Sequence, residues 1–253
     1  MAKYKIGITE AGDAGLDLSW TKRLDSVDGA VLITKCISPH FLKEVLAHKD
    51  KIIIHATFTG YGGTVIEPCV PPPYDEFDAI LQLVKAGFPK EHIVIRVDPI
   101  IPTLKGVRTA LSVIETFIDQ GFSRYRISVV DMYPHVRDRF KQAGVPLPYG
   151  DYFSPSKEQL RRVDEMVRIA KVYWADQNGD VPFRIESCAE PGLIEPIQCG
   201  CISAYDLGLL GLDVTEADNT GFQRKHCLCY SGKTELLEHK ARCPHGCLYC
   251  YWR

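Results

Sequence analysis

The sequence HIVIRVDP, residues 92–99, contains the pattern that decides the fold. Its first six residues, His92–Val97, are apolar nearly throughout and rich in Ile and Val, which is typical of a strand covered on both faces of a parallel sheet. Arg96 is the exception, and a charge inside such a run needs a partner or a ligand. Asp98 follows at the spacing that places it on the same face of the strand. The segment therefore predicts a buried strand that ends in a charged site.

Five similar runs occur elsewhere in the chain, with helical patterns between them. The runs are Tyr4–Ile8, Ala30–Thr34, Ile52–Thr57, Arg124–Val130 and Pro182–Glu186. This alternation predicts a parallel sheet with right-handed crossovers, and six strands suit a partial (β/α)6-type, TIM-like barrel. A doubly wound open sheet is the alternative, although neither a G-x-G-x-x-G nor a Walker motif supports it.

The expected helices carry boundary signals. Ser38-Pro39 joins a cap to a proline at the first helical position, and Ser154-Pro155 is expected to open a longer helix in the same way. Another helix is expected over Tyr74–Ala86. An apolar stripe over Val107–Ile118 predicts a helix that ends at Gly121.

The composition describes an ordinary globular protein. The chain has 253 residues, is 45% hydrophobic and 25% charged, and has a formal net charge of −2. These values exclude a disordered chain, a collagen and a coiled coil, and they give no global basic field. Without a long apolar segment or a signal-peptide pattern, we expect no membrane association and a cytoplasmic location, which is the host cytoplasm for a viral chain. The oligomeric state is not indicated.

Catalytic groups of βα barrels lie at the carboxyl ends of the strands. At these ends the sequence has Lys35, Arg96 and Asp98, which we take as candidate catalytic residues, although polar residues at a strand end can also simply meet solvent. Tyr133 lies close to another strand end and is a candidate hydrogen-atom donor. The thiol of Cys69 is a rival donor.

The ten cysteines are unevenly distributed, and eight of them lie between residues 188 and 250. We therefore divide the chain into a βα barrel, residues 1–187, and a cysteine-rich cluster-binding segment, residues 188–253, packed on it within one structural domain. Ten cysteines are too few for a disulfide scaffold. In a reducing compartment such cysteines are more often metal ligands or reactive thiols.

The last three cysteines, Cys243, Cys247 and Cys250, have the spacing C-x3-C-x2-C. A short loop of this kind directs three thiolates toward one point, where they can hold three irons of a cubane and leave the fourth iron open. Zinc is the alternative, with His245 as an additional ligand.

The block from Cys243 to Tyr251 resembles the cluster motif of radical S-adenosylmethionine (SAM) enzymes, and its Tyr-Cys-Tyr ending is similar to that of spore photoproduct lyase. Most members carry the motif after the first barrel strand. The present chain carries it in the C-terminal part, and in this it resembles a radical-SAM-like family of bacterial and phage proteins. Residues 9–20 depart from that family's pattern. The matching segments include Thr34-Lys35, Ile66–Pro68, Arg96–Ile100, Ser128–Tyr133, Cys188–Glu190, Cys201-Ile202 and Gln223-Arg224.

The resemblance implies that Cys243, Cys247 and Cys250 bind a [4Fe–4S] cluster whose open iron chelates SAM, with Tyr249 beside the adenine. It implies reduction by an electron donor such as flavodoxin or ferredoxin. Cleavage of SAM would give a 5′-deoxyadenosyl radical that abstracts hydrogen from an unreactive carbon.

Four further cysteines, Cys188, Cys201, Cys227 and Cys229, also match the family pattern. They are enough to ligate a second, auxiliary [4Fe–4S] cluster. Cys199 is the alternative to Cys201 as a ligand, and a structural zinc ion is the alternative to the cluster.

The resemblance also implies DNA or a nucleotide base as the partner, because the radical-SAM-like relatives with a known reaction act in phage thymidine hypermodification. An isomerase of the Cα-glycylthymidine synthase type would convert an N-glycyl base into a C-glycyl base. Lys35, Arg96 and Asp98 would then bind the glycyl carboxylate and amine.

Basic and aromatic residues interleave at Arg124–Arg126, His135–Lys141 and Gln223–His226, as phosphate and base contacts do. A solvated surface has the same composition. The other functions that the sequence allows are radical SAM chemistry on a small molecule or peptide, a DNA-lesion lyase, and a zinc or iron–sulfur protein without radical chemistry.

Overall fold

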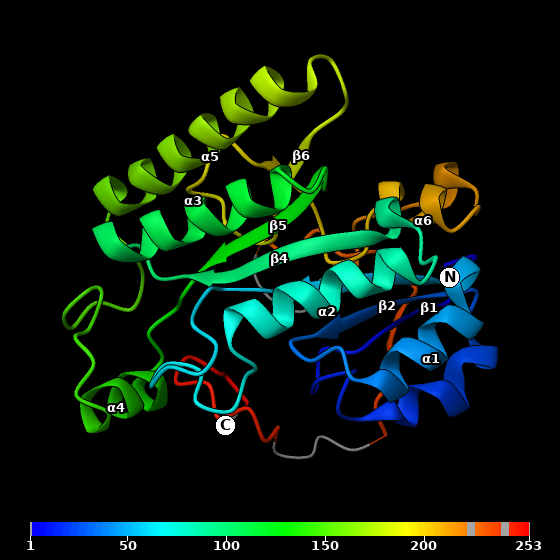
Figure 1. Ribbon diagram of the computed structural model, residues 1–253, viewed down its shortest axis with the longest axis horizontal. Helices are drawn as coiled ribbons and strands as arrows, with labels where there is room; N and C mark the ends of the chain where they lie inside the picture. The colour runs from blue at the N-terminus through cyan, green and yellow to red at the C-terminus, as the bar shows by residue number, and fades with distance from the viewer. Residues whose placement is uncertain (1, 222–225, 239–242, 253) are drawn as a thin grey trace.

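The computed structural model describes residues 2–221, 226–238 and 243–252 and contains one eight-stranded parallel sheet (Figure 1). Its strands are β1 (Ile6–Ile8), β2 (Gly29–Thr34), β3 (Ile52–Thr57), β4 (Ile93–Ile100), β5 (Arg124–Val129), β6 (Arg184–Ser187), β7 (Ile197–Gln198) and β8 (Lys233–Glu235). The α/β class and the six expected strand regions are confirmed. β7 and β8 were not expected, because they are only two and three residues long and contain no apolar run.

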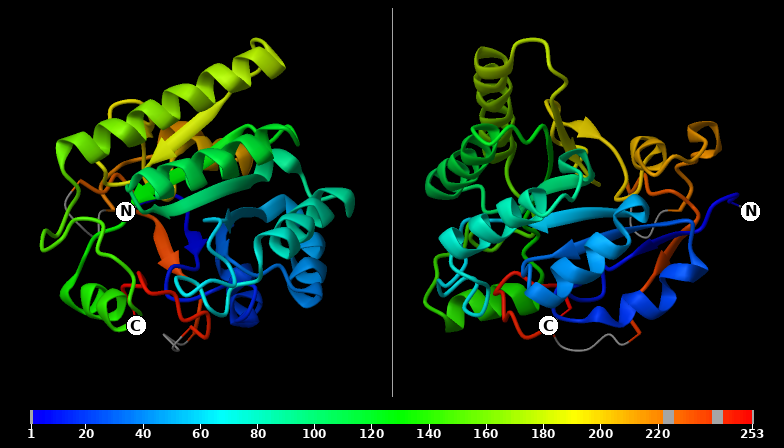
Figure 2. Two further views of the ribbon diagram at one scale, coloured as in Figure 1. Left: turned by 60° about the vertical axis from the view of Figure 1, so that its left-hand side comes forward. Right: turned by 45° about the vertical axis from the view of Figure 1, so that its right-hand side comes forward.

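The strands lie in the order β7-β6-β5-β4-β3-β2-β1-β8. From β1 to β7 each strand pairs with the next one along the chain, and β8 pairs with the remaining edge of β1. Figure 2 shows β8 beside β1, although the two strands lie at opposite ends of the sequence. The cysteine-rich segment therefore contributes strands to the same sheet.

The described residues form six α-helices, and most of them cover one face of this sheet. The helices are α1 (Pro39–Ala47), α2 (Pro73–Lys85), α3 (Leu104–Ile118), α4 (Pro134–Gln142), α5 (Lys157–Asn178) and α6 (Ala204–Leu209), with short 3-10 segments at Leu18–Ser26, Lys49–Lys51, Lys90–His92 and Val214–Glu216. Helices α1, α2, α3 and α5 lie on the same outer face (Figure 1). There Ile52, Ile54 and Ile95 of the strands join the main hydrophobic core.

The helix caps explain two of the boundaries. The hydroxyl of Ser38 accepts a hydrogen bond from the amide of Phe41, so the expected start of α1 is confirmed. The expected start of α5 at Ser154-Pro155 is wrong by two residues. Ser156 is the N-cap, because it and Gln159 form a reciprocal pair of side-chain-to-backbone hydrogen bonds.

The inner face of the sheet changes character from one strand to the next. On β1 to β4 it has an apolar part that packs against the C-terminal segment, formed by Ile6, Val31, Ile53, Val94, Ile202, Leu207 and Tyr230. On β5 and β6 the same face buries the charged side chains of Arg124, Arg126 and Glu186. Since side chains on a strand alternate between faces, β5 places its arginines inward and Tyr125 and Ile127 outward, and β4 has Arg96 on the same face as the apolar Val94. Only the outer faces of these two strands are thus apolar throughout.

Within the described ranges, no helix combines the length and the apolar character needed to cross a membrane.

Candidate metal and cofactor site

A cavity of about 440 Å³ lies at the carboxyl ends of the strands. Lys35, Arg96 and Asp98 line it, so the structure brings these three candidate residues together. Two sets of cysteines also line it. We call Cys188, Cys201, Cys227 and Cys229 the interior cysteine group, and the segment Cys243–Cys250, whose three cysteines all line the cavity, the terminal cysteine loop. The two sets therefore share one cavity.

The interior cysteine group draws its members from three places in the fold. Cys188 follows β6, Cys201 precedes α6, and Cys227 and Cys229 precede β8. The sulfur atoms of Cys188, Cys201 and Cys229 all lie within 4.8 Å of one another. Cys227 packs against Cys188 and Cys229. Such a group could bind a metal ion or an iron–sulfur cluster.

Cys201, rather than Cys199, belongs to this compact set among the described residues. Hydrogen bonds with Cys188 and Cys229, together with the nearby guanidinium groups of Arg126 and Arg96, hold the pKa of the Cys201 thiol well below its usual range. For Cys199, burial raises the pKa of the thiol to about 12. The positions of the sulfur atoms and the direction of these pKa shifts both make Cys201 the better candidate ligand of the two.

The terminal cysteine loop is anchored to the segment between β3 and α2 and to α4. The backbone amide of Leu248 donates to the carbonyl of Ile66 at 2.9 Å. The Arg139 side chain of α4 donates to the carbonyls of Leu248 and Cys250, and Figure 1 shows α4 close to the C-terminal segment. Gly246 has a φ of 71°, which permits the tight turn expected of this loop.

His245 occupies the middle of the loop, and both of its ring nitrogens have protein partners. Nε2 lies 2.8 Å from the carboxylate of Asp13, and Nδ1 lies 3.1 Å from the carbonyl of Cys69. Burial opposes protonation of this ring, but the bond to Asp13 raises the pKa of His245 above its usual value. Because both nitrogens are engaged by protein groups, the structure does not support the alternative in which His245 joins the cysteines as a zinc ligand.

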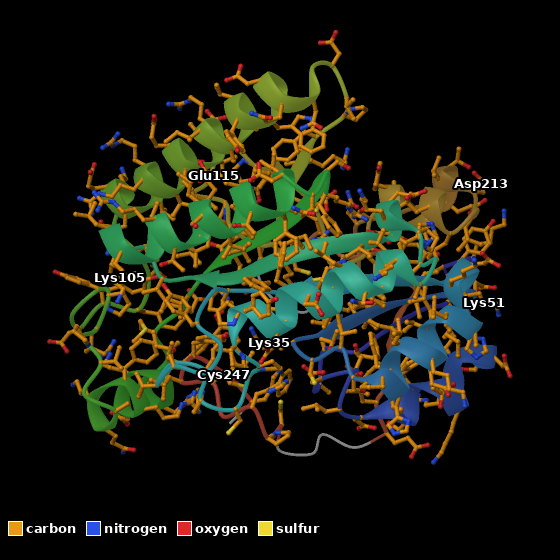
Figure 3. The ribbon with its side chains drawn as sticks, viewed as in Figure 1. Lys35, Lys51, Lys105, Glu115, Asp213 and Cys247 are labelled. Atoms are coloured by element: carbon orange, nitrogen blue, oxygen red, sulfur yellow. The ribbon has the colours of Figure 1, made fainter. Side chains whose placement is uncertain are left out.

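Lys35, Glu67 and Tyr249 form a buried polar cluster beside the loop. The ammonium of Lys35 lies 2.8 Å from a carboxylate oxygen of Glu67 and 5.5 Å from the centre of the Tyr249 ring. The hydroxyl of Tyr249 donates to the same carboxylate. Lys35 and Cys247, both labelled in Figure 3, line the same cavity. Lys35 thus fixes the position of Tyr249 as well as lining the cavity.

Arg96 and Asp98 meet the requirement that a charge on a buried strand must have a partner. Nε of Arg96 donates to Asp98 at 2.6 Å, and the hydroxyl of Ser128 donates to the other oxygen of Asp98. Burial acts against ionisation of Asp98, but Arg96 and Ser128 lower its pKa. The cavity therefore holds a preformed ion pair with both signs of charge.

The candidate donors Tyr133 and Cys69 do not line the cavity. The ring of Tyr133 packs against Tyr251, with centroids 5.1 Å apart, and against Phe153. Tyr251 does line the cavity, so Tyr133 is one residue removed from it. Cys69 has an exposed side chain.

The interpretation of Arg124–Arg126 as a nucleic-acid contact is wrong. Arg124 and Arg126 are buried on the inner face and donate to Glu186, while Arg124 also donates to Asp206. The sequence HVRDRFK, residues 135–141, forms most of α4, an amphipathic helix that buries Val136 and Phe140. Of the third basic run, residues 223–225 lie outside the described residues.

Asp13 and Glu67 are site residues to which the sequence assigned no role. Asp13 lies in the stretch that departs from the family pattern. Its carboxylate accepts hydrogen bonds from the amide of Lys35 at 2.7 Å and from the hydroxyl of Thr34, in addition to contacting His245. The carboxylate also accepts from the nearby amide of Gly15 at 2.8 Å. The sequence gives no signal for the other three partners, because all of them are distant from Asp13 along the chain.

Replacing Asp13 by asparagine is expected to loosen the terminal cysteine loop. The amide can no longer accept from all three partners, and a lost charged hydrogen bond typically costs about 1.5–3 kcal/mol. Hydrogen exchange measured by mass spectrometry on peptides covering Cys243–Cys250 should become roughly ten-fold faster or more. Asp28→Asn, at an exposed carboxylate that accepts from the Lys5 amide, is the matched control and should leave these peptides unchanged. Equal exchange in the two variants would show that Asp13 does not anchor the loop.

The fold and the site define a class: an α/β protein whose parallel sheet ends in a cavity lined by cysteines that could bind a metal. A family model described as a domain of unknown function (DUF1848) matches residues 19–252, and the chain belongs to that family. Neither the curated proteins nor the solved structures include a match to the chain.

Proposed function

We propose that the protein is a radical SAM enzyme. The observation that carries the proposal is that Cys243, Cys247 and Cys250 all line a cavity at the carboxyl ends of a parallel sheet, together with paired charged side chains. These three thiolates would hold a [4Fe–4S] cluster and leave one iron free for the amino and carboxylate groups of SAM. The chemistry that the cluster and SAM supply together is reductive cleavage of SAM with hydrogen abstraction from a substrate.

The residues of the loop fit a three-ligand site. A structural zinc site is closed by four protein ligands. Among the described residues, the histidine of the loop, His245, has both nitrogens engaged by Asp13 and Cys69. Within that part of the chain, three cysteines without a histidine ligand favour a cluster with an open position over a zinc ion. In the same proposal the eight-stranded sheet is a partly closed, TIM-like barrel whose interior keeps water from the reacting groups.

The chain's own side chains would orient the bound groups. Tyr249, whose hydroxyl donates to Glu67, would contact the adenine. Arg96 and Asp98 present opposite charges to the cavity, which suits a group that carries both a carboxylate and an amine. Because Lys35 and Arg96 already have carboxylate partners, a substrate carboxylate would share these cations rather than meet free ones.

As the reaction we propose isomerisation of a modified thymidine base in DNA, from an N-glycyl to a C-glycyl attachment, with flavodoxin or ferredoxin as reductant in a cytoplasmic setting. The glycyl group offers the charges that Arg96 and Asp98 complement. One observation favours a second candidate, the same chemistry on a small molecule or peptide. The burial of Arg124 and Arg126 removes two of the phosphate contacts that the sequence suggested.

Anaerobic protein loaded with iron and sulfide is expected to form 5′-deoxyadenosine from SAM when dithionite is added, as measured by liquid chromatography and mass spectrometry. Omitting dithionite is the control and should give none. Protein that carries four irons and four sulfides per chain at the terminal loop but forms no 5′-deoxyadenosine would refute the radical SAM proposal.

The substrate is tested separately with DNA that contains the N-glycyl-modified base. We expect a new nucleoside of identical mass and different retention time after digestion. Turnover of SAM with unchanged DNA would reject the DNA substrate and favour the small-molecule alternative.

A further inference from the structure

Three sulfur atoms of the interior cysteine group, those of Cys188, Cys201 and Cys229, lie unusually close together for an iron–sulfur cluster. The sulfurs of Cys188 and Cys201 lie 3.7 Å apart, and those of Cys188, Cys201 and Cys229 are mutually within 4.8 Å. A tetrahedral ion with metal–sulfur bonds of about 2.3 Å places its sulfur ligands about 3.8 Å apart. In a cubane each thiolate binds a different iron, so the sulfurs lie outside the corners of the cube and much farther apart.

The terminal cysteine loop provides an internal comparison. The described residues contain one group of three or more metal-ligating side chains with all donor atoms within 4.8 Å, and it is the interior one. Cys243, Cys247 and Cys250 line the same cavity without drawing together in this way. The sulfur atoms are therefore closer together in the interior group than in the terminal loop. This is the difference expected if the interior group binds a single ion and the terminal loop binds a larger cluster.

Cys227 lies beside the compact set of three and supplies the fourth thiolate. Its sulfur is not within 4.8 Å of all three others, but Cys227 is buried, packs against Cys188 and Cys229, and is within hydrogen-bonding reach of the Cys188 thiol, so a small shift of its side chain would bring it to a common ion. Four thiolates and no open position are the ligand set of a structural zinc site. A single divalent ion with four thiolates carries two excess negative charges, and Lys233 lies 3.8 Å from the sulfur of Cys229 to offset part of them.

Two backbone segments of the interior cysteine group, one at Gly200 and the other at Leu228-Cys229, lie in close contact. A Cβ on Gly200 would lie 2.3 Å from the carbonyl oxygen of Leu228 and 2.5 Å from Cα of Cys229, so only glycine allows the two chain segments to touch here. This contact brings the amide of Cys201 to 3.2 Å from the sulfur of Cys229. Amide-to-sulfur hydrogen bonds of this kind orient metal-bound thiolates.

We propose that Cys188, Cys201, Cys227 and Cys229 bind a single tetrahedral zinc ion instead of the second iron–sulfur cluster that the family resemblance implies. The ion joins the end of β6, the start of α6 and the approach to β8. Its role is to fasten the C-terminal segment across the inner face of the sheet and to form one wall of the cavity. The proposal deepens the proposed function but does not depend on the terminal loop binding iron.

The test is metal analysis of the full chain, both as purified and after anaerobic loading with iron and sulfide. We expect about one zinc per chain at the interior group, and about four irons and four sulfides at the terminal loop. Cys201→Ser should lose the zinc and keep the iron and sulfide. Cys243→Ala should do the reverse. Cys199→Ser, the matched control at a neighbouring cysteine outside the compact set, should keep both.

About eight irons per chain with no zinc, of which Cys201→Ser loses half, would overturn the proposal. Should Cys201→Ser fail to fold, X-ray absorption at the zinc edge of the wild-type chain decides. Four sulfur neighbours at about 2.3 Å support the site, and nitrogen or oxygen neighbours overturn it. Zinc without iron would support this proposal and refute the radical SAM proposal, so the two can fail separately.

Discussion

Replacing Glu186 by glutamine is expected to lower the free energy of unfolding by about 3–5 kcal/mol, because it removes one partner from a buried ion-pair network. Glu186 is fully buried and accepts from Arg126 at 2.7 Å and from Arg124 at 3.1 Å. Asp206 is the second carboxylate and takes one bond from Arg124 at 2.7 Å. The neutral amide would leave two buried guanidinium groups facing a single carboxylate. Since domains of this kind have only about 5–15 kcal/mol of stability, the loss is large.

Urea unfolding of the full chain, followed by circular dichroism, measures this loss. Glu158→Gln is the matched control, because Glu158 forms exposed pairs with Arg161 and Arg162 on α5 that should contribute little. If Glu186→Gln unfolds at the same urea concentration as the control, the buried network contributes no net stability.

The pH dependence of the same experiment has a definite sign. Burial opposes ionisation of Glu186, but Arg126 and Arg124 overcome it and lower its pKa to about 2. A carboxyl group whose pKa is depressed in the folded state contributes stability above its unfolded pKa, near 4.5, and loses it as the pH falls toward 2. The difference in the free energy of unfolding between wild type and Glu186→Gln should therefore become smaller as the pH falls below 4.5.

The buried network also shows where prediction from the sequence failed. The run Arg124-Tyr125-Arg126 has the composition of a nucleic-acid contact, yet its arginines point inward because alternation on β5 assigns the outer face to Tyr125. Their partners, Glu186 and Asp206, lie 60 to 82 residues away. Such a pairing is set by the tertiary fold and leaves no local signal. The strand itself, by contrast, was recognisable from its apolar outer residues.

Some residues of the candidate site were likewise recognisable from the sequence, and others were not. Spacing alone made the three terminal cysteines candidates, because a short loop restricts where their sulfurs can lie, and all three line the cavity. The interior group was assembled from matching segments, which favoured Cys201 over Cys199, and the structure places Cys201 in the compact set. Asp13 and Glu67 could not have been assigned roles, since each acts through residues brought near by the fold, His245 and Tyr249.

Replacing Cys247 by alanine is expected to abolish the cleavage of SAM. Cys247 is the buried member of the terminal set and lies between the other two in sequence, so its removal leaves two thiolates for a site that needs three. Loss of even an outer-shell partner of a metal site typically costs about 10–100-fold in affinity or activity, so loss of a ligand should cost more than about 100-fold. Alanine keeps the side chain small and apolar and limits any effect on packing.

The measurement has to separate loss of the cluster from loss of the fold. Cys247→Ala should lose iron, sulfide and 5′-deoxyadenosine formation while keeping its circular dichroism spectrum and its zinc. Cys36→Ala is the matched control, because the Cys36 thiol is half-buried and does not line the cavity, and it should retain all of these properties. Wild-type rates of 5′-deoxyadenosine formation in Cys247→Ala would show that the terminal loop is not the catalytic centre. If Cys247→Ala instead loses zinc and retains iron, the terminal loop binds the zinc and the interior cysteine group binds the iron–sulfur cluster.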